Sequence, residues 1–312
     1  MSINKDIVIK LVIPIILFSS IVIFGPFIYR NIIKNNKESL PTFVRNWIEK
    51  RDSRIEPSEV VYKDELSLRI IEGWSIKDIS EYIASEGLNE VDFKGIVGTP
   101  KVDYRKQEDN ELPTDYLKEF SFLESKPSYY GLEGFLFPDT YRVYSDASSE
   151  DLVLKMLENF DSKLSLELRD EIKKQGKSIY DVIIMASLIE KEAPINYSDS
   201  ENKDARIVSD IFWQRLKIGQ ALQSDATLSY WFNDNNPVHS GGELDADTPY
   251  NSYKYTGLPP TPICNPSLRA IEAAIYPIDT NYNYFLTSLD GENIYYASTY
   301  QEHLNNKYKY LK

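Results

Sequence analysis

An uncharged run near the N-terminus places the firmest constraint on how this chain of 312 residues can fold. The run covers residues 11–29, LVIPIILFSSIVIFGPFIY, and lies between Lys10 and Arg30. A helix of that length spans roughly 28 Å, close to the thickness of the hydrocarbon core of a bilayer. The sequence therefore predicts a cytoplasmic tip and a transmembrane helix over residues 1–30.

A cleaved signal peptide is the alternative interpretation of this run. Such peptides carry a small-residue cleavage site, but no alanine occurs before residue 40 and no cysteine is there for lipid attachment. We therefore expect an uncleaved single-pass anchor. Basic residues flank the run on both sides, so charge alone leaves its topology open; they are Lys5, Lys10, Arg30, Lys34 and Lys37.

Composition excludes several classes of function for the rest of the chain. Hydrophobic residues make up 42% and charged residues 27%, which is typical of a folded globular protein. The net charge of −13 argues against a nucleic-acid-binding protein, because such proteins neutralise phosphates with Lys and Arg. Cys264 is the single cysteine and His239 and His303 the two histidines, so we predict no disulfide, no metal site and no cofactor.

The residues after the anchor divide into a small and a large α+β region. Residues 31–113 form a linker and a small domain, in which Leu66, Leu68 and Ile70 alternate as in a strand. A turn follows at residues 72–73, and Ser75 with Asp78 predicts a capping box. The next helix places Ile76, Ile79 and Ile83 on one stripe, and the charged residues 101–113 read as a surface loop.

Residues 114–312 are expected to form a larger mixed α+β domain. One helix begins at Ser178 and continues until Pro194, and a second covers about 204–217, with Gly219 at its C-terminal end. Residues 281–298 read as a hairpin that turns at Asp290–Gly291, and residues 299–311 as a terminal helix.

An acidic residue lies on the apolar stripe of the helix after Ser178. Ile179, Ile183 and Ala186 lie on one face, and Glu190 continues the row. Partial burial and the helix C-terminus should both raise the pKa of Glu190, which suits a general acid. The alternative is a boundary residue whose carboxylate reaches water. Glu192 lies about 200° further round the helix, so it diverges from Glu190 and reads as an orienting or solvated residue.

Two later segments suggest a ligand-binding surface. Gln223, Asp225 and Thr227 occupy alternate positions, so a half-extended strand would point all three the same way, toward a hydroxyl-rich ligand or toward solvent. Residues 248–266 are rich in Pro, Gly and Tyr, which is typical of a rigid loop that lines a substrate site. No nucleophile elbow surrounds Ser240, so a Ser–His triad is not expected.

These segments, in this order, resemble the MltG/YceG-like endolytic murein transglycosylase family. The matching pieces are LEGFLFPDTY (132–141), ASLIEKEA (186–193), IFWQRLKIGQALQSDAT (211–227), TPYNSYKYTGLPPTPICNPS (248–267) and YFLTSLDGENIYYASTYQEH (284–303). Residues 114–312 look like the family's catalytic domain. Upstream, LSLRIIEGWSIKDISEYIASEGL (66–88) is similar, less specifically, to its small LysM-like domain. Ser224 and Ala226 stand where the family usually shows Thr and Pro.

The resemblance implies that Glu190, the first acid of EKE, is the catalytic acid/base and that the catalytic domain lies outside the cytoplasm. It implies an enzyme that cleaves the MurNAc–GlcNAc bond of peptidoglycan glycan strands and leaves 1,6-anhydro-MurNAc ends, terminating or trimming nascent strands beside cell-wall synthesis and division proteins. The residues expected to hold the glycan are Glu192, Gln223, Asp225, Thr227, Asn251 and Tyr253. The alternatives are a hydrolytic muramidase, with Asp225 as its second carboxylate, and a non-catalytic wall-binding scaffold protein.

Overall fold

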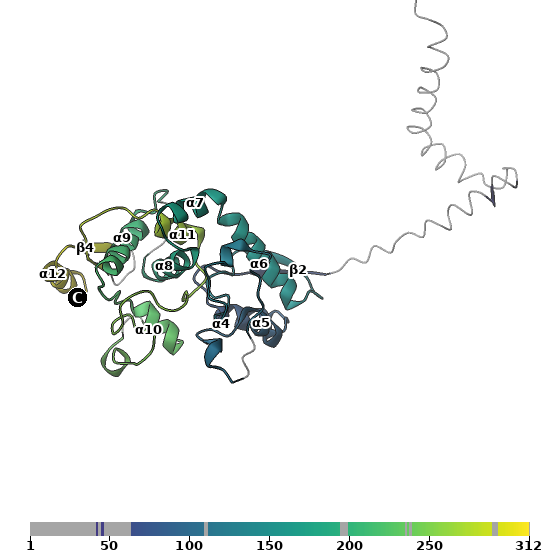
Figure 1. Ribbon diagram of the computed structural model, residues 1–312, viewed down its shortest axis with the longest axis horizontal. Helices are drawn as coiled ribbons and strands as arrows, with labels where there is room; N and C mark the ends of the chain where they lie inside the picture. The colour runs from purple at the N-terminus through teal and green to yellow at the C-terminus, as the bar shows by residue number, and fades with distance from the viewer. Residues whose placement is uncertain are drawn as a thin grey trace, which may run out of the picture. The chain divides into compact units, whose positions relative to one another are not determined.

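The computed structural model describes residues 42, 45–46, 64–108, 112–193, 199–234, 236, 239–288 and 293–311. The chain divides into two compact units, Met1–Tyr62 and Lys63–Lys312, and nearly all of the described residues belong to the second (Figure 1). The predicted transmembrane helix of residues 11–29 lies outside the described residues. Among the helices that are described, none has both the length and the apolar character of a membrane span.

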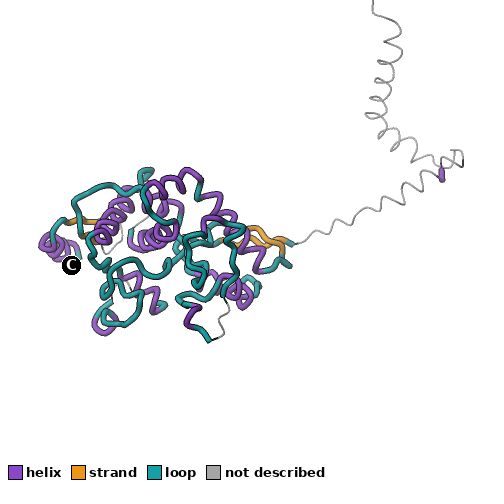
Figure 2. The backbone as a smooth tube through the Cα atoms, in the orientation of Figure 1, coloured by secondary structure: helices purple, strands orange, loops and turns teal. Residues whose placement is uncertain are grey.

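The second unit is a mixed α+β structure, as predicted, in which helices and loops predominate (Figure 2). Its strands form two separate antiparallel pairs, β1 with β2 and β3 with β4. In chain order the helices and strands are β1 (Glu65–Arg69), α4 (Ile76–Ser85), α5 (Glu90–Val97), β2 (Thr140–Tyr144), α6 (Ser149–Lys163), α7 (Leu166–Lys174), α8 (Ile179–Glu192), α9 (Lys203–Lys217), α10 (Asp225–Phe232), α11 (Leu268–Ile275), β3 (Tyr284–Thr287), β4 (Ile294–Ala297) and α12 (Tyr300–Tyr310). Short 3-10 turns cover Tyr104–Lys106, Ser121–Leu123 and Gly241–Glu243.

Helix α8 runs through the core of this unit. Every residue from Val182 to Ile189 is buried, because α9 and α11 pack against this helix (Figure 1). A helix that is apolar on all sides is buried, either in a protein core or in a membrane. The predicted start is confirmed, since the Ser178 hydroxyl accepts a hydrogen bond from the Asp181 backbone N–H at 3.0 Å. The core therefore fixes the C-terminal end of α8, which carries the EKE motif.

The small and large predicted regions meet in one sheet. The predicted strand at 65–69 is present, and its partner is β2, in which Leu66 lies opposite Val143 and Leu68 opposite Tyr141. The capping box of α4 is also confirmed, and Ile76, Ile79 and Ile83 are fully buried. Because β1 pairs with β2, the start of α4 is held against residues of the larger region.

The prediction of a half-extended strand at 223–227 is wrong. Residues 225–232 form helix α10, and only Gln223 and Ser224 precede it in a non-helical conformation. Gln223 is exposed, Asp225 opens the helix and Thr227 is fully buried, so the three side chains do not share one face. Successive residues of a helix are rotated by about 100°, which separates positions that a strand would align.

The C-terminal elements follow the prediction. Strands β3 and β4 pair with Tyr284 opposite Ala297, and the predicted turn at 290–291 lies outside the described residues. Helix α12 follows a capping box formed by Thr299 and Glu302. Helix α9 is also confirmed, and Gly219 adopts a left-handed conformation one residue after its C-cap.

Candidate active site

The two acids of the EKE motif lie at the C-terminal end of α8 and contact different helices. The carboxylate of Glu190 accepts hydrogen bonds from the Ser267 backbone N–H at 2.9 Å and from the Ser267 hydroxyl at 2.6 Å. The carboxylate of Glu192 accepts one from the Ser224 hydroxyl and one from the Ala226 backbone N–H at 3.4 Å. Ser267 and Ser224 are the N-cap residues of α11 and α10. Each acid therefore holds the start of a neighbouring helix.

Burial raises the pKa of both acids above that of an exposed glutamate. For Glu190, burial is the largest cause and the nearby Glu72 adds to it, while the two bonds from Ser267 lower the pKa. For Glu192, burial is again the largest cause, and the bonds from Ser224 and Ala226 lower the pKa. A raised pKa favours the protonated form of a carboxyl group, which is the form that general-acid chemistry uses. The raised pKa of each acid is therefore compatible with the role of general acid.

A cleft of about 430 Å³ lies beside both acids. Glu192 lines this cleft, and the side chain of Glu190 lies beside Gly73, another of its lining residues. Ser267, the partner of Glu190, lines a second cavity of about 320 Å³ beside Arg69 and Glu72. One side of the first cleft comes from the start of α4 and the other from α10 and the residues after it; its lining includes Gly73, Ser75, Lys77, Asp78, Lys191, Asp225, Ala226, Ser229, Tyr230 and Ile263.

The predicted glycan-binding residues differ in how accessible their polar atoms are. Asp225 lines the cleft and accepts a hydrogen bond from the His239 backbone N–H at 3.2 Å. Tyr253 is half-buried beside Asp225, and burial and that carboxylate raise the pKa of its hydroxyl. Gln223 is exposed, with a left-handed backbone (φ 55°).

Thr227 and Asn251 have their polar atoms bonded within the protein. The Thr227 hydroxyl donates to the Ser224 carbonyl at 2.9 Å and lies 2.9 Å from the Ser252 hydroxyl. The Asn251 side chain donates to two backbone carbonyls, at 2.8 and 2.9 Å, and accepts from two backbone N–H groups. These two residues shape the loop beside the cleft.

Comparison with known proteins identifies the family. A sequence model of the YceG-like family matches residues 44–309. The chain belongs to this family. The endolytic murein transglycosylase of Bacillus subtilis (strain 168) is 38% identical over 181 residues, which cover 58% of this chain and 48% of that protein. The Streptococcus pneumoniae (strain R6) protein of the same name is 30% identical over 261 residues, covering 80% of this chain and 45% of that protein.

The chain therefore spans about half the length of these relatives. A crystal structure of a yceG-like protein from Listeria monocytogenes superposes with a TM-score of 0.64 at 28% identity, covering 82% of this chain and 80% of that one. The YceG-like fold thus extends over both the α4 side and the α10 side of the cleft.

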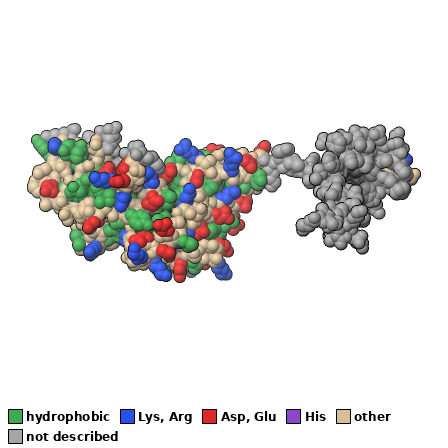
Figure 3. All heavy atoms as spheres, turned by 90° about the horizontal axis from the view of Figure 1, so that it is seen from above, with side chains coloured by type: hydrophobic (Ala, Val, Ile, Leu, Met, Phe, Trp, Pro, Cys, Tyr) green, Lys and Arg blue, Asp and Glu red, His purple; other side chains and the backbone are tan. Residues whose placement is uncertain are grey.

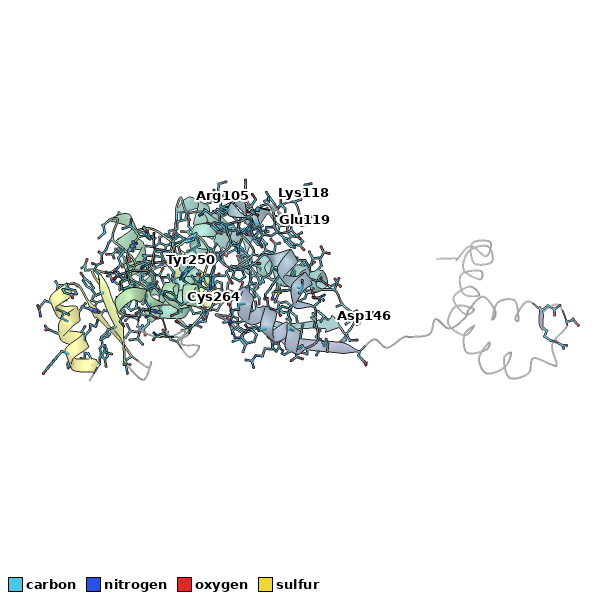
Figure 4. All side chains as sticks on the ribbon, turned by 90° about the horizontal axis from the view of Figure 1, so that it is seen from below. Arg105, Lys118, Glu119, Asp146, Tyr250 and Cys264 are labelled. Carbon is cyan, nitrogen blue, oxygen red and sulfur yellow. The ribbon has the colours of Figure 1, made fainter. Side chains whose placement is uncertain are left out.

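Several residues of this YceG-like site were not predicted. Ser75 and Asp78 were expected only to cap α4, but they also line the cleft together with Lys77. Lys191, between the two acids, lines it as well. The residues 248–267 are largely buried, as Tyr250 and Cys264 illustrate (Figure 4), and only Ile263 of this segment lines the cleft. No local sequence pattern predicts that α4 faces α10.

One group of side chains near the cleft contains possible metal ligands. Atoms of Asp234, His239 and Glu243 lie within 4.8 Å of one another. The two ring nitrogens of His239 face different partners, however: Nε2 lies 3.0 Å from the Ser229 hydroxyl and Nδ1 lies 3.3 Å from Glu243. A single ion would use one nitrogen together with both carboxylates. The arrangement therefore fits a buried, hydrogen-bonded histidine, and we assign it no metal.

Proposed function

We propose that this chain is a membrane-anchored endolytic lytic transglycosylase. It would cleave the MurNAc–GlcNAc bond of peptidoglycan strands and leave 1,6-anhydro-MurNAc ends. The observation that carries the proposal is Glu192, an acid of raised pKa that lines a cleft on the surface of a YceG-like fold. The names of the Bacillus and Streptococcus relatives support the same reaction.

We assign the acid/base role to Glu192 and keep Glu190, the acid that the sequence predicted, as its rival. A general acid must come within hydrogen-bonding reach of the glycosidic oxygen. Glu192 lines the larger cleft, where a sugar chain can approach it. Glu190 is bonded to the N-cap of α11 through Ser267, just as Glu192 is bonded to the N-cap of α10 through Ser224, so these bonds do not separate the two acids.

The chemistry needs only one carboxyl group. The protonated acid donates to the glycosidic oxygen as an oxocarbenium-like centre develops at C1 of the muramic sugar. The resulting carboxylate then accepts the proton of that sugar's C6 hydroxyl, which attacks C1. An intramolecular nucleophile has a high effective concentration, so no enzymic nucleophile is required.

A hydrolytic muramidase is the second candidate, because Asp225 lines the same cleft as Glu192. A second carboxylate could activate a water molecule. Asp225 also has a structural task, since it accepts the His239 backbone N–H and interacts with the Tyr253 hydroxyl. That second role favours Asp225 as a residue that shapes the site and contacts the sugar.

The same proposal covers the cellular location of the chain and the role of its smaller domain. Residues 11–29 would anchor the chain in the cell membrane, with residues 114–312 on the extracytoplasmic side. A LysM-like domain within residues 31–113 would contact the wall, and division and wall-synthesis proteins would be its partners. Acidic and basic side chains are interspersed over the visible surface (Figure 3), and the net charge of −13 does not favour nucleic acid.

Mass analysis of the products from purified glycan strands tests this proposal. We expect 1,6-anhydro-MurNAc ends, lighter by one water than reducing ends and inert to borohydride, and early shortening of long strands through internal cuts. Reducing ends would identify the muramidase, with Asp225 as the second carboxylate. Binding of strands without cleavage would identify the wall-binding scaffold.

A further inference from the structure

Glu133 is a buried acid that joins the two sides of the cleft. It is 2% exposed and belongs to the segment LEGFLFPDTY, between the 3-10 turn at Ser121–Leu123 and strand β2. Its Oε1 accepts a hydrogen bond from the backbone N–H of Ile76, the first residue of α4, at 2.9 Å. Its Oε2 accepts one from the hydroxyl of Tyr230, on α10, at 2.9 Å.

A third partner connects Glu133 to the loop before α11. The side-chain amide of Asn265 lies 3.4 Å from Oε1 and also donates to the Trp74 carbonyl at 2.9 Å. Asn265 itself is fully buried, and its backbone N–H donates to the same Trp74 carbonyl at 2.8 Å. The turn before α4 is thus held to the segment that supplies Ile263 to the cleft.

The same helix contacts both Glu133 and Glu192. Ala226 donates its backbone N–H to Glu192, and Tyr230, four residues later, donates its hydroxyl to Glu133. Residues four apart lie above one another on a helix. Helix α10 is therefore bonded to Glu192 at its first turn and to Glu133 at its second.

Lys101 secures the far end of α10 to the same side of the cleft as α4. Its ammonium lies 4.8 Å from the centre of the Tyr230 ring and donates to the Trp231 carbonyl at 3.2 Å and to the Asn233 side chain. A cation over an aromatic ring and at a helix C-terminus is favourable in both respects.

We propose that Glu133 is a positioning residue of this active site: it ties α4 to α10 and so fixes Glu192 relative to the sugar chain. The inference rests on the proposed function. Glu133 is too deeply buried to touch a substrate, so it would act through α10. A displacement of about 1 Å at a catalytic group can lower the rate about a hundredfold. Hydrogen bonds that prevent such a displacement therefore preserve the rate.

Three variants of the full chain test the proposal. Glu133→Leu removes both acceptor atoms, Tyr230→Phe removes one hydroxyl, and Glu133→Gln keeps an acceptor for Ile76 and can bond to Tyr230. Glu158→Leu and Glu158→Gln, on the exposed face of α6, are the matched controls. For each variant we would measure kcat and KM for anhydro-end formation, the melting temperature, and backbone hydrogen exchange within residues 225–232.

We expect Glu133→Leu to lower kcat at least about tenfold with KM within about twofold, and Tyr230→Phe to lower it a few-fold. Glu133→Gln should stay close to the wild type, and exchange in α10 should accelerate in the first two variants only. If Glu133→Leu does not fold, Tyr230→Phe decides. Wild-type kcat and wild-type exchange of α10 in Tyr230→Phe would overturn the proposal.

The two proposals can fail separately. If the wild-type chain forms no anhydro ends, the proposed function fails, and exchange of α10 in the same variants still measures the tie through Glu133. If the wild type is active but the folded Glu133→Leu variant has normal kcat, Glu133 has a structural role alone and the positioning role is overturned.

Discussion

At the scale of single residues, the EKE motif offers a direct comparison of two acids on one helix. Both have a raised pKa, and each accepts a backbone N–H and a serine hydroxyl at a helix start. Glu192 lines the larger cleft, and Glu190 lies beside Gly73, which lines the same cleft. Both side chains are half-buried, so measured rates of single variants must decide between them.

The first prediction compares single variants of the two acids. Glu192→Gln should lower anhydro-end formation at least about a hundredfold, because the amide cannot donate a proton to the leaving oxygen. Glu190→Gln should lower it less, since the amide oxygen still accepts from Ser267. Rates on purified strands, with melting temperatures as the folding control, check both. A larger loss in Glu190→Gln would return the acid/base role to the residue that the sequence predicted.

The second prediction concerns pH and stability. Burial raises the pKa of Glu133 to about 8, compared with 4.5 for an ordinary glutamate. The unfolded chain thus loses this proton at lower pH than the folded chain, so this group's contribution is fully present below about 4.5 and is lost as pH rises toward 8. Each pKa unit corresponds to about 1.4 kcal/mol, which amounts to a few kcal/mol in all.

Glu133→Gln carries no titrating group at this position, so its stability should fall less than that of the wild type between pH 5 and pH 8. Denaturant unfolding at both pH values measures the difference. Glu158→Gln is the control, because its exposed side chain should leave the wild-type decline unchanged. An equal decline in Glu133→Gln and the wild type would show that Glu133 does not titrate in this range.

At the scale of elements, the sequence predicted some of the helices that have local caps, but not α6, which begins with the same kind of capping box as α4. The starts of α8 and α4 were predicted from their capping pairs, Ser178 with Asp181 and Ser75 with Asp78. The structure contains both caps. Helix α10 was missed because it is short, from Asp225 to Phe232, and because its first turn is bonded to Glu192, 34 residues earlier in the chain. Strand β2 was missed for the same reason, since its partner β1 is distant in sequence.

The candidate site, too, was only partly predictable from the sequence. The 3.6-residue period correctly predicted that Glu190 and Glu192 diverge. The choice between them depends on where α4 and α10 lie, which only tertiary packing determines. Thr227 and Asn251 were selected by residue type and motif position, whereas their bonding inside the protein follows from contacts with Ser224, Ser252 and Leu244.

The third prediction belongs to the first turn of α10. Ala226 stands where the resembling family usually has proline, and a proline lacks the N–H that here donates to Glu192. Ala226→Pro should be tolerated, because proline suits the first turn of a helix. Removing a donor to the ionised form should raise the pKa of Glu192 further.

A general acid works while protonated, so activity is lost as pH rises through its pKa. The alkaline limb of the pH–rate profile of Ala226→Pro should therefore move to higher pH, with little change in melting temperature. Leu166→Pro, at the exposed first residue of α7, is a comparison for nonspecific effects of proline. A limb that stays in place, or moves to lower pH, would contradict a contribution of this N–H to the proton affinity of Glu192.

At the scale of the whole molecule, the elements that line the cleft all belong to the compact unit Lys63–Lys312. The start of α4 is held to that unit by the pairing of β1 with β2 and by the bonds to Glu133 and Asn265. The segment that resembles a LysM-like domain therefore supplies one side of the cleft. Deleting it would remove part of the candidate active site as well as the proposed wall-binding element.

The last prediction separates anchoring from catalysis. A chain that lacks residues 1–62 keeps every described contact of the cleft, so it should fold and cleave soluble glycan strands at a rate within a few-fold of the full chain.

The full chain should fractionate with membranes through residues 11–29, and protease added to spheroplasts should digest the residues beyond about 40. The shortened chain should appear in the soluble fraction. Because the proposed substrate is part of the wall, the shortened chain should also act more slowly on strands at the membrane than the anchored one does. Protection of the large domain from external protease would contradict the extracytoplasmic location. Loss of cleavage in a folded shortened chain would mean that residues 1–62 contribute to the site itself.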